Sequence, residues 1–335
     1  MNQELRDDVM QQFVQQVNNL ARGFMGSQVL FEANEAGFFA LLEQACSVED
    51  VAKETGLNAH ALRILLDGMH ALGLVTKVDG LYVNAPMASA CLVPGRPGYQ
   101  GHIVQHMKHV SQSWARLSES LRSGTGVSRE EAERSPEELR AFILGMNDIA
   151  KFSAKELLTV LDLSAYQHML DLGGGPATYP IAFLQAHPAM RATVFDFAPV
   201  VEIGQEQVAK AGLRERVNFI AGDMTKDDFG SGYDLILISN IIHSFGPEMN
   251  REIVRKCYRA LESGGMLIIK DFLVDNDRSG PAFGLMFAIN MLVNTPEGDT
   301  YTYAEVRDWT DQAGFVSGHA IDLTPQTRLW TCEKP

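Results

Sequence analysis

Met169-Leu170-Asp171-Leu172-Gly173-Gly174-Gly175-Pro176-Ala177-Thr178 is the stretch that decides the fold. Its apolar run ends in an acid, and three consecutive glycines follow before a predicted helix that includes Ile181-Ala182-Phe183-Leu184. A strand, a tight glycine turn and a helix start form the place where a parallel sheet holds a nucleotide-type cofactor. Glycine suits the turn because the backbone bends sharply there and lies against the ligand without an intervening Cβ.

The residues around this turn indicate which cofactor it binds. A dinucleotide site has the pattern Gly-x-Gly-x-x-Gly and points a helix N-terminus at a pyrophosphate. Here Gly173 and Gly175 are followed by Thr178 where the third glycine belongs, and the carboxylate of Asp171 would repel a pyrophosphate. An acid at this place suits a cationic ligand instead. S-adenosylmethionine (SAM) carries an ammonium and a sulfonium and has no phosphate, so the turn predicts a SAM site.

Two further predicted strands also end in acids. Val194-Phe195-Asp196 places a carboxylate where it would accept hydrogen bonds from two ribose hydroxyls. The apolar run 217–220 leads into Gly222-Asp223-Met224, whose acid and methionine could flank an adenine. A single acid at a strand end is as often a helix cap or a solvated loop residue. Three acids after three consecutive strands favour a cofactor site.

Five motifs, in this order, resemble the SAM-dependent small-molecule O-methyltransferases, which include plant caffeate and flavonoid enzymes, hydroxyindole O-methyltransferase and bacterial polyketide-tailoring enzymes. The motifs are Asp171-Leu-Gly-Gly-Gly175, Phe195-Asp196-Phe-Ala-Pro199, Gly222-Asp223-Met224, Ile241-Ile242-His243 and Ser263-Gly264-Gly265. The resemblance extends over nearly the whole chain and implies SAM as the cofactor. Its predicted binding residues are Asp171, Gly173, Gly175, Asp196, Asp223, Met224 and Ser239.

The predicted catalytic base follows the fourth strand. A hydroxyl acceptor needs a base because its pKa lies well above 7, and histidine is best matched to that task. His243 lies just beyond the predicted strand 233–238 and matches the family's catalytic histidine. The resemblance implies that Asp271 is one of two carboxylates that flank this base in the plant enzymes. A structural histidine that caps the next helix is the alternative interpretation of His243.

Two departures from the family pattern bear on the acceptor. Ser244 stands directly after the histidine, where the family usually has Asp. The position of the second flanking carboxylate aligns with Thr300, and Glu297 and Asp299 are near it but out of register. The base is therefore expected to be less well supported than in the phenolic enzymes, which leaves a carboxylate, thiol or carbon acceptor open.

The resemblance also implies where the acceptor binds. Residues 283–292 resemble the family's substrate-lining helix, in which Met beside Phe gives an adaptable apolar wall. Asn290 and Met291 are its candidate substrate residues, and Asn240, beside the fourth strand, is another. A helix rich in Met and Phe is more often core than pocket, so the family match is what favours this role.

Three histidines occur at helical spacing, His102, His106 and His109. They would lie on one helix face, either in an acceptor pocket or in a metal site. A metal shell would need a carboxylate from elsewhere. No metal is therefore predicted, and His106 is a candidate substrate residue.

Together these residues predict a SAM-dependent methyltransferase for a small molecule, with a hydroxyl oxygen as the favoured acceptor atom. A methyltransferase for sulfur or carbon on the same fold is the first alternative. A non-catalytic regulator that binds DNA is the second. A nicotinamide dehydrogenase is the third, and Thr178 and Asp171 disfavour it.

The composition limits the domain number, the partners and the cellular compartment that are expected for this protein. A chain of 335 residues is long enough for two domains, and a net charge of -14 disfavours nucleic acid and anionic membranes as partners. The four cysteines form no Cys-x-x-Cys pair, so neither a zinc site nor a disulfide framework is expected. Residues 1–8 are polar and acidic, unlike a signal peptide, and no apolar run approaches 18 residues, so a cytoplasmic protein is expected.

An N-terminal domain over residues 1–98 is predicted to be mainly helical and to contain a winged helix. Ser47-Val-Glu-Asp50 is a capping box, a longer helix begins at the cap Asn58, and a hairpin at 74–83 forms the wing. Winged helices often bind DNA, but residues 47–85 contain three Lys or Arg against five Asp or Glu. That balance does not neutralise a phosphate backbone, and a dimerisation module is the favoured reading.

Residues 3–25 predict a helix with one apolar face. The face consists of Leu5, Val9, Phe13, Val17, Leu20 and Phe24. In the family that this chain resembles, the corresponding arm packs across a homodimer. Packing of the stripe on its own domain is the alternative.

A catalytic domain is predicted over residues 99–335, after a linker at 86–101 that contains three prolines and three glycines. Alternating strands and helices give an α/β fold, the doubly wound parallel sheet of class I methyltransferases. Helices are expected over 101–122, 136–150, 153–163, 250–261 and 303–314. The last two strands, near 317–322 and 328–332, are expected to form an antiparallel hairpin around Thr324-Pro325-Gln326.

Overall fold

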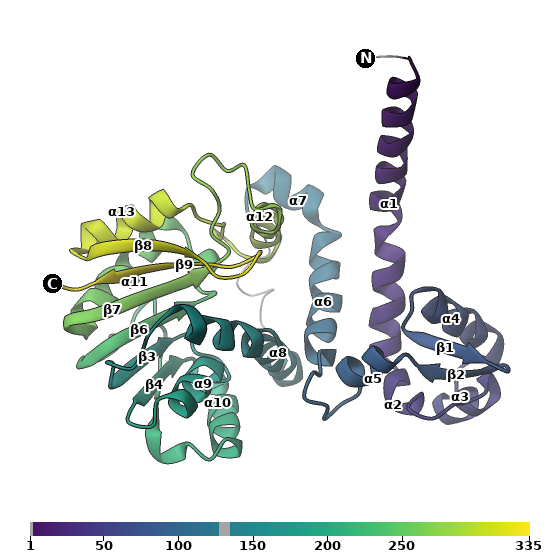
Figure 1. Ribbon diagram of the computed structural model, residues 1–335, viewed down its shortest axis with the longest axis horizontal. Coiled ribbons are helices and arrows are strands. Elements are labelled where there is room, and N and C mark those ends of the chain that lie inside the picture. Colours follow the sequence, from purple (N-terminus) through teal and green to yellow (C-terminus); the bar gives the residue numbers. More distant parts are fainter. Residues whose placement is uncertain (1–2, 127–134) are drawn as a thin grey trace. The chain divides into compact units, whose positions relative to one another are not determined.

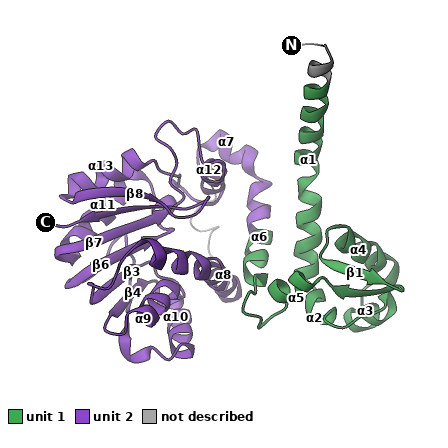
Figure 2. Cartoon of the chain, in the orientation of Figure 1, with its two compact units in different colours: residues 1–108 green, residues 109–335 purple. Residues whose placement is uncertain are grey.

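The structure is a computed structural model that describes residues 3–126 and 135–335, with side chains in the first helix described from residue 8. The chain divides into two compact units, residues 1–108 and 109–335 (Figure 2). The domain boundary expected from the sequence, after residue 98, falls between α5 (Pro86–Leu92) and α6 (Gly101–Trp114).

The N-terminal unit contains a long helix and a winged helix (Figure 1). Its first elements are α1 (Gln3–Glu35), α2 (Phe38–Leu41), α3 (Val48–Thr55), α4 (Ala59–Ala71), β1 (Val75–Val78) and β2 (Leu81–Asn84). The predicted capping box is confirmed: the Ser47 hydroxyl accepts from the Asp50 N–H at 3.1 Å, and the Asp50 carboxylate accepts from the Ser47 N–H at 3.2 Å. Strands β1 and β2 form the predicted antiparallel hairpin.

The apolar stripe of α1 is exposed. Its described members are between 47% and 75% exposed, namely Val9, Phe13, Val17, Leu20 and Phe24, and the side chain of Leu5 lies outside the described residues. Packing of the stripe on its own domain is therefore wrong for these five side chains. A continuous exposed apolar face of this kind marks an interaction surface.

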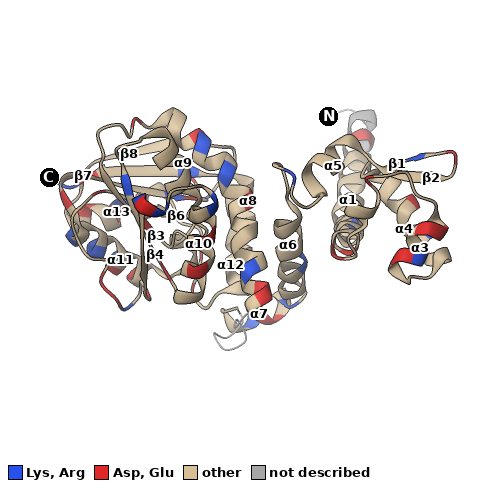
Figure 3. Cartoon of the chain, turned by 90° about the horizontal axis from the view of Figure 1, so that it is seen from below, with Lys and Arg blue, Asp and Glu red and all other residues tan. Residues whose placement is uncertain are grey.

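The basic side chains of the winged helix are largely paired with acids. Asp67 of α4 lies 2.8 Å from the guanidinium of Arg63 and 2.7 Å from the ammonium of Lys77. Hydrogen bonds from Lys77 and Tyr82 hold the pKa of Asp67 at about 2. On α3, acidic positions and a basic position occur together along the same short helix (Figure 3).

The C-terminal unit is a seven-stranded sheet in the order β5-β4-β3-β6-β7-β9-β8. The first five of these strands are parallel, and β9 and β8 form the predicted antiparallel hairpin at one edge (Figure 1). The strands are β3 (His168–Leu172), β4 (Arg191–Asp196), β5 (Val217–Ala221), β6 (Tyr233–Ser239), β7 (Leu261–Asp271), β8 (Val316–Asp322) and β9 (Arg328–Glu333).

Helices cover both faces of this sheet, which confirms the doubly wound fold. They are α8 (Pro136–Val160), α9 (Thr178–Ala186), α10 (Ala198–Lys210), α11 (Pro247–Ala260) and α13 (Tyr303–Ala313). Two further helices, α7 (Leu117–Ser123) and α12 (Ala282–Asn294), contact each other. Alternate strand residues enter two separate cores, one shared with α11 and α13 and the other with α8, α9 and α10. Short 3-10 helices lie at Arg214–Arg216 and Ile242–Ser244.

Three expectations about helices and linkers are wrong. The helix expected over 101–122 is two helices, α6 and α7, and the two helices expected over 136–150 and 153–163 are the single helix α8. The linker expected at 86–101 begins with α5, because the fixed φ of Pro86 is compatible with the first turn of a helix. None of the described helices combines the length and apolar character that a membrane span requires.

Candidate active site

The glycine turn after β3 has the backbone geometry that only glycine adopts easily. Gly173 and Gly175 have φ angles of 69° and 53°, in the left-handed region. A Cβ at residue 173 would also overlap the side chain of Ile241, and Met224 Cε would lie 3.2 Å from it. The turn is therefore packed against residues that follow two other strands, β5 and β6.

Asp171 is buried beneath this turn. Its side chain is 1% exposed, and Oδ2 has no hydrogen-bond partner among the described residues. Burial, and then the nearby Asp196, raise the pKa of Asp171 to about 8. A buried carboxyl group with an unpaired oxygen is costly, and a cationic ligand would relieve that cost. The site therefore fits a ligand that carries an ammonium or a sulfonium, as SAM does.

Asp196 ends β4 and is held by two backbone donors. Its Oδ2 accepts from the Gly175 N–H at 2.8 Å, and its Oδ1 accepts from the Phe197 N–H at 2.8 Å. Burial raises the pKa of Asp196, and the two N–H donors oppose that rise. A hydrogen bond therefore joins the glycine turn directly to this acid.

Asp223 and Met224 follow β5. The carboxylate of Asp223 accepts from Lys226 at 2.8 Å and from the Thr225 hydroxyl at 2.6 Å. Burial opposes its ionisation, but Lys226 and Thr225 hold its pKa at about 2. This acid is therefore ionised, unlike Asp171 at neutral pH. Met224 is buried and reaches the glycine turn.

His243 and Asp271 form a buried pair. His243 lies on the short helix after β6, Asp271 ends β7, and the imidazole Nδ1 is 2.7 Å from Asp271 Oδ1. Because a carboxylate only accepts, the imidazole proton lies on Nδ1 and leaves Nε2 as a proton acceptor. Asp271 is itself held by the Phe272 N–H, which donates to Oδ1 at 2.8 Å. This geometry is compatible with an oriented general base.

Aromatic rings surround the base. The ring of Phe287, on α12, is 4.9 Å from the imidazole at a steep angle, and that of Phe272 stacks at 5.8 Å. Phe283 extends the cluster, 5.1 Å from Phe272. Sequence reasoning placed this helix near the acceptor but did not identify the ring contacts with His243.

Among the described residues, Asp271 is the only carboxylate bonded to the imidazole. Thr300 is buried, and its hydroxyl donates to the Gly284 carbonyl at 3.2 Å. Asp299 donates its backbone N–H to the His243 carbonyl at 3.1 Å, and its carboxylate lies 3.6 Å from Arg278. Glu297 packs beside Gly246 instead. The loop supports the backbone of the histidine rather than its ring.

The candidate substrate residues on α12 are both engaged within the protein. Met291 is buried, at 6% exposed. Asn290 uses its Oδ1 to accept from Trp114 Nε1 at 2.9 Å and from Asn294 at 3.0 Å. Trp114 was missed, because a hydrogen bond across 176 residues leaves no local signal.

The three helical histidines are divided between the units. His106 and His102 belong to the N-terminal unit, in which the His102 ring is 4.9 Å from that of Tyr99, and His109 begins the C-terminal unit. Within residues 3–126 and 135–335, no group of three or more His, Cys, Asp or Glu could hold a metal ion.

Ser239 and Asn240 lie at the end of β6 and are half-buried. Ser239 is in register with Lys270 of β7. Asn240 has a φ of 56° and accepts a hydrogen bond from the ammonium of Lys270 at 3.1 Å. Sequence reasoning missed Lys270, although a lysine within an apolar strand was a visible signal.

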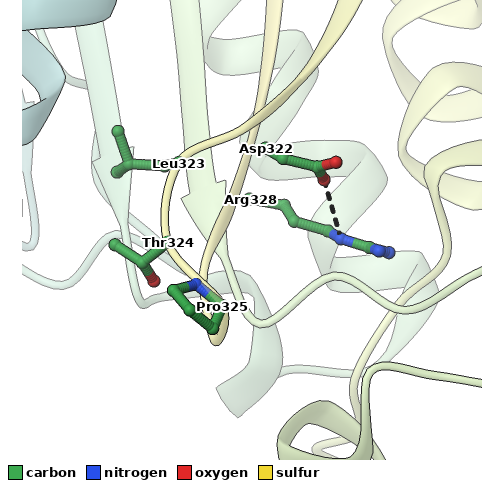
Figure 4. Close-up of a pocket in the computed structure, with 5 residues that line it drawn as sticks. All are labelled: Asp322, Leu323, Thr324, Pro325 and Arg328. Atoms are coloured by element: carbon green, nitrogen blue, oxygen red, sulfur yellow. Dashed lines mark ion pairs between the residues drawn. The ribbon is translucent and has the colours of Figure 1, made fainter.

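Neither His243 nor Asp271 lines either of two surface hollows. One, of about 330 Å³, is lined by the β8–β9 hairpin, with Asp322 and Arg328 joined by an ion pair of 3.0 Å (Figure 4). The other, of about 380 Å³, is lined by α12 and residues 295–299. None of the residues predicted to bind SAM lines either hollow.

Comparisons with known proteins agree with this geometry. A family model for an O-methyltransferase domain matches residues 114–316, and one for an O-methyltransferase dimerisation domain matches residues 18–94. The chain is 35% identical to a 3-hydroxy-5-methyl-1-naphthoate 3-O-methyltransferase from Streptomyces sahachiroi, over 89% of this chain and 88% of that protein. It is 33% identical to acetylserotonin O-methyltransferase from Bos taurus, over 88% and 90% of the two chains. The crystal structure of human N-acetylserotonin methyltransferase in complex with SAM superposes with a TM-score of 0.88, at 28% identity, over 96% of this chain and 98% of that chain.

Proposed function

Since this chain belongs to the family of SAM-dependent small-molecule O-methyltransferases, we propose that His243 takes the proton of an acceptor hydroxyl during methyl transfer. SAM, when bound, supplies an activated methyl group on its sulfonium. The residues that would hold it are Asp171, Gly173, Gly175, Asp196, Asp223, Met224 and Ser239. The observation that supports this proposal most directly is the buried His243–Asp271 pair, which lies in the same unit as these strand-end residues. Because the imidazole donates its Nδ1–H to Asp271, its Nε2 can accept a proton.

The proposed chemistry of His243 depends on Asp271 at its Nδ1 and on the acceptor at its Nε2. Asp271 orients the imidazole and stabilises the imidazolium that forms when the acceptor proton arrives at Nε2. The rings of Phe272 and Phe287 lie against the imidazole, Phe283 extends the cluster, and together they offer aromatic edges and faces to an acceptor. We therefore expect a planar aromatic molecule that carries a hydroxyl group. The relatives named for a hydroxynaphthoate and for acetylserotonin support this class of acceptor.

The homodimer is part of the same proposal. The exposed apolar face of α1 would be buried against a second copy of the chain, and the match of a dimerisation domain to residues 18–94 supports this. Pairing of Arg63 and Lys77 with Asp67 argues against DNA as the partner. All four cysteines are free thiols, which fits a reducing cytoplasm.

Two measurements test the proposal. Calorimetric titration with S-adenosylhomocysteine (SAH) should give binding that weakens sharply in Asp196→Ala, while NADH should not bind. With an aromatic hydroxyl acceptor, His243→Ala should keep SAH affinity and lower kcat by about 10²- to 10⁴-fold, the usual share of a general base. Unchanged turnover would remove His243 from the mechanism and favour the alternative of a sulfur or carbon acceptor.

A further inference from the structure

Lys270 is a buried cation within the core of the sheet. It is 1% exposed and occupies the position before Asp271 in β7. Its strand neighbours in register are Ser239 of β6 and Leu329 of β9. Lysine is almost never fully buried unless it is paired, because burial removes the hydration of the ammonium.

Within the described residues, the contacts of this ammonium include a neutral amide and an aromatic ring but no negative charge. Nζ donates to Asn240 Oδ1 at 3.1 Å and lies 5.9 Å from the centre of the Tyr179 ring. In the part of the chain that the structure describes, no carboxylate forms an ion pair with it. An ammonium has three N–H donors, so the neutral amide of Asn240 satisfies one of them.

A second buried lysine in the same unit shows the contrast. Lys256 is 7% exposed, and its ammonium donates to the carbonyl oxygens of Met224 at 3.1 Å and Asp227 at 2.9 Å. Backbone carbonyls therefore satisfy Lys256 as a structural residue. Lys270 has no such pair of carbonyl acceptors in the described structure.

Asn240 connects Lys270 to the cofactor turn, because the next residue, Ile241, packs against the turn at Gly173. Successive strand residues point to opposite faces, so Asp271 contacts His243 while Lys270 faces Tyr179 of α9. Helix α9 begins directly after the glycine turn. Asn240, which accepts from the ammonium, is only half-buried at this end of the sheet.

Asn240 is held next to Lys270 by its own backbone. Its backbone N–H donates to the Lys270 carbonyl at 2.8 Å, and its positive φ is one that asparagine tolerates. Because its Oδ1 accepts from the ammonium, its amide N–H donors remain for another acceptor. An ammonium and an amide side by side match the two oxygens of a carboxylate.

We propose that Lys270 and Asn240 form a carboxylate-binding pair in the methyl-transfer site, an inference that rests on the function proposed above. Two ligands of the proposed reaction could supply the carboxylate. SAM carries a carboxylate in its amino-acid tail, and an aromatic hydroxy acid would carry one on the acceptor.

Paired ligands with and without the carboxylate distinguish the two sources. Wild type and Lys270→Met are titrated with SAH and with its decarboxylated analogue, 5′-deoxy-5′-(3-aminopropylthio)adenosine. In the presence of SAH, both proteins are then titrated with 3-hydroxy-2-naphthoate and with its methyl ester. We expect wild type to prefer the carboxylate member of one pair by about 10- to 100-fold, as for a charge-assisted hydrogen bond, and the variant to lose that preference.

The controls separate a binding role from a structural one. Lys256→Met removes a buried ammonium without touching the pair, so it should change both members of each ligand pair equally. The ligand-free Lys270→Met protein should unfold at the same or a higher temperature, because the variant no longer buries an unpaired charge. If it fails to fold, Asn240→Gly removes the other half of the pair and keeps the positive φ.

The outcomes are distinct. If wild type binds SAH but neither carboxylate preference changes in Lys270→Met or Asn240→Gly, the pair is not a carboxylate site and only this inference is overturned. If wild type does not bind SAH at all, the proposed function fails, and the inference fails with it.

Discussion

Replacement of Asp271 by asparagine tests the proposed base most directly. The change keeps the size of the side chain. In Asp271, Oδ1 accepts from both the imidazole Nδ1–H at 2.7 Å and the Phe272 N–H at 2.8 Å, and Oδ2 accepts from the His243 N–H at 3.4 Å. In asparagine an NH2 group replaces one of these oxygens, so in either orientation of the amide a donor faces a donor. The hydrogen bonds that orient His243 are weakened, and the charge that stabilises its imidazolium is lost.

The expected effect is large and confined to turnover. A charge-assisted hydrogen bond contributes about 1.5–3 kcal/mol, and loss of the correct tautomer adds to it, as for the aspartate of a serine-protease triad. We therefore expect kcat of Asp271→Asn to fall by about 10²- to 10⁴-fold, with SAH affinity within about twofold of wild type. Steady-state kinetics with an aromatic hydroxyl acceptor and calorimetry with SAH measure the two quantities.

A pH series makes this test specific. Above the pKa of the acceptor, about 10 for a phenol, the hydroxyl ionises without a base, so the deficit of Asp271→Asn should shrink as the pH rises. Thr300→Val is the matched control, because Thr300 is buried nearby but bonds to the Gly284 carbonyl instead of the imidazole. A variant Asp271→Asn with kcat within threefold of wild type at pH 7 would refute the assignment.

Three further predictions concern the cofactor site and the dimer. Asp196→Ala should weaken SAH binding by at least about 10-fold, because a charge-assisted hydrogen bond contributes about 1.5–3 kcal/mol; equal affinity by calorimetry would make Asp196 purely structural. Asp171 has a folded pKa of about 8 against an ordinary value of 3.8, so the folded state holds its proton more tightly and stability is lost as the pH rises from about 4 to about 8. Asp171→Asn should therefore stabilise the SAM-free protein by up to about 6 kcal/mol above pH 8 and by little near pH 4, and urea unfolding that shows no such pH dependence would contradict this. Phe13→Asp with Phe24→Asp should give a monomer by light scattering, since both rings lie on the exposed face of α1, and an unchanged molar mass would place the dimer interface elsewhere.

Local signals explain which parts of the fold could be predicted. The caps Ser47 and Asn58 lie where their helices begin, because capping depends on residues within one turn. The apolar runs that end in Asp171 and Asp196 form neighbouring parallel strands, in register over five residue pairs for β4 and β5 and for β3 and β4. Acids at consecutive strand ends meet at one edge of a parallel sheet, so their proximity followed from the pattern.

Long-range packing explains what the sequence did not show. Two helices were expected on either side of residues 151 and 152, but α8 continues through them, because neither Lys151 nor Phe152 breaks a helix. The hydrogen bond of Trp114 to Asn290 and the ring contact of Phe287 with His243 join distant segments. Such contacts depend on which face of a helix meets the sheet, and this is set by the fold as a whole.

The departures at Ser244 and Thr300 now have a physical meaning for the acceptor. The loop that contains Thr300 holds the His243 carbonyl through the Asp299 N–H, so the position of the base is fixed without a second carboxylate. What a second carboxylate would add is charge, which stabilises the imidazolium and strengthens the base. With Asp271 alone, proton transfer is effective for hydroxyls whose pKa is not far above that of the base. A phenolic hydroxyl, with a pKa of about 10, meets this condition better than an aliphatic alcohol does. The reaction rate across a series of aromatic acceptors should therefore rise as the acceptor hydroxyl becomes more acidic, until ionisation no longer limits the transfer.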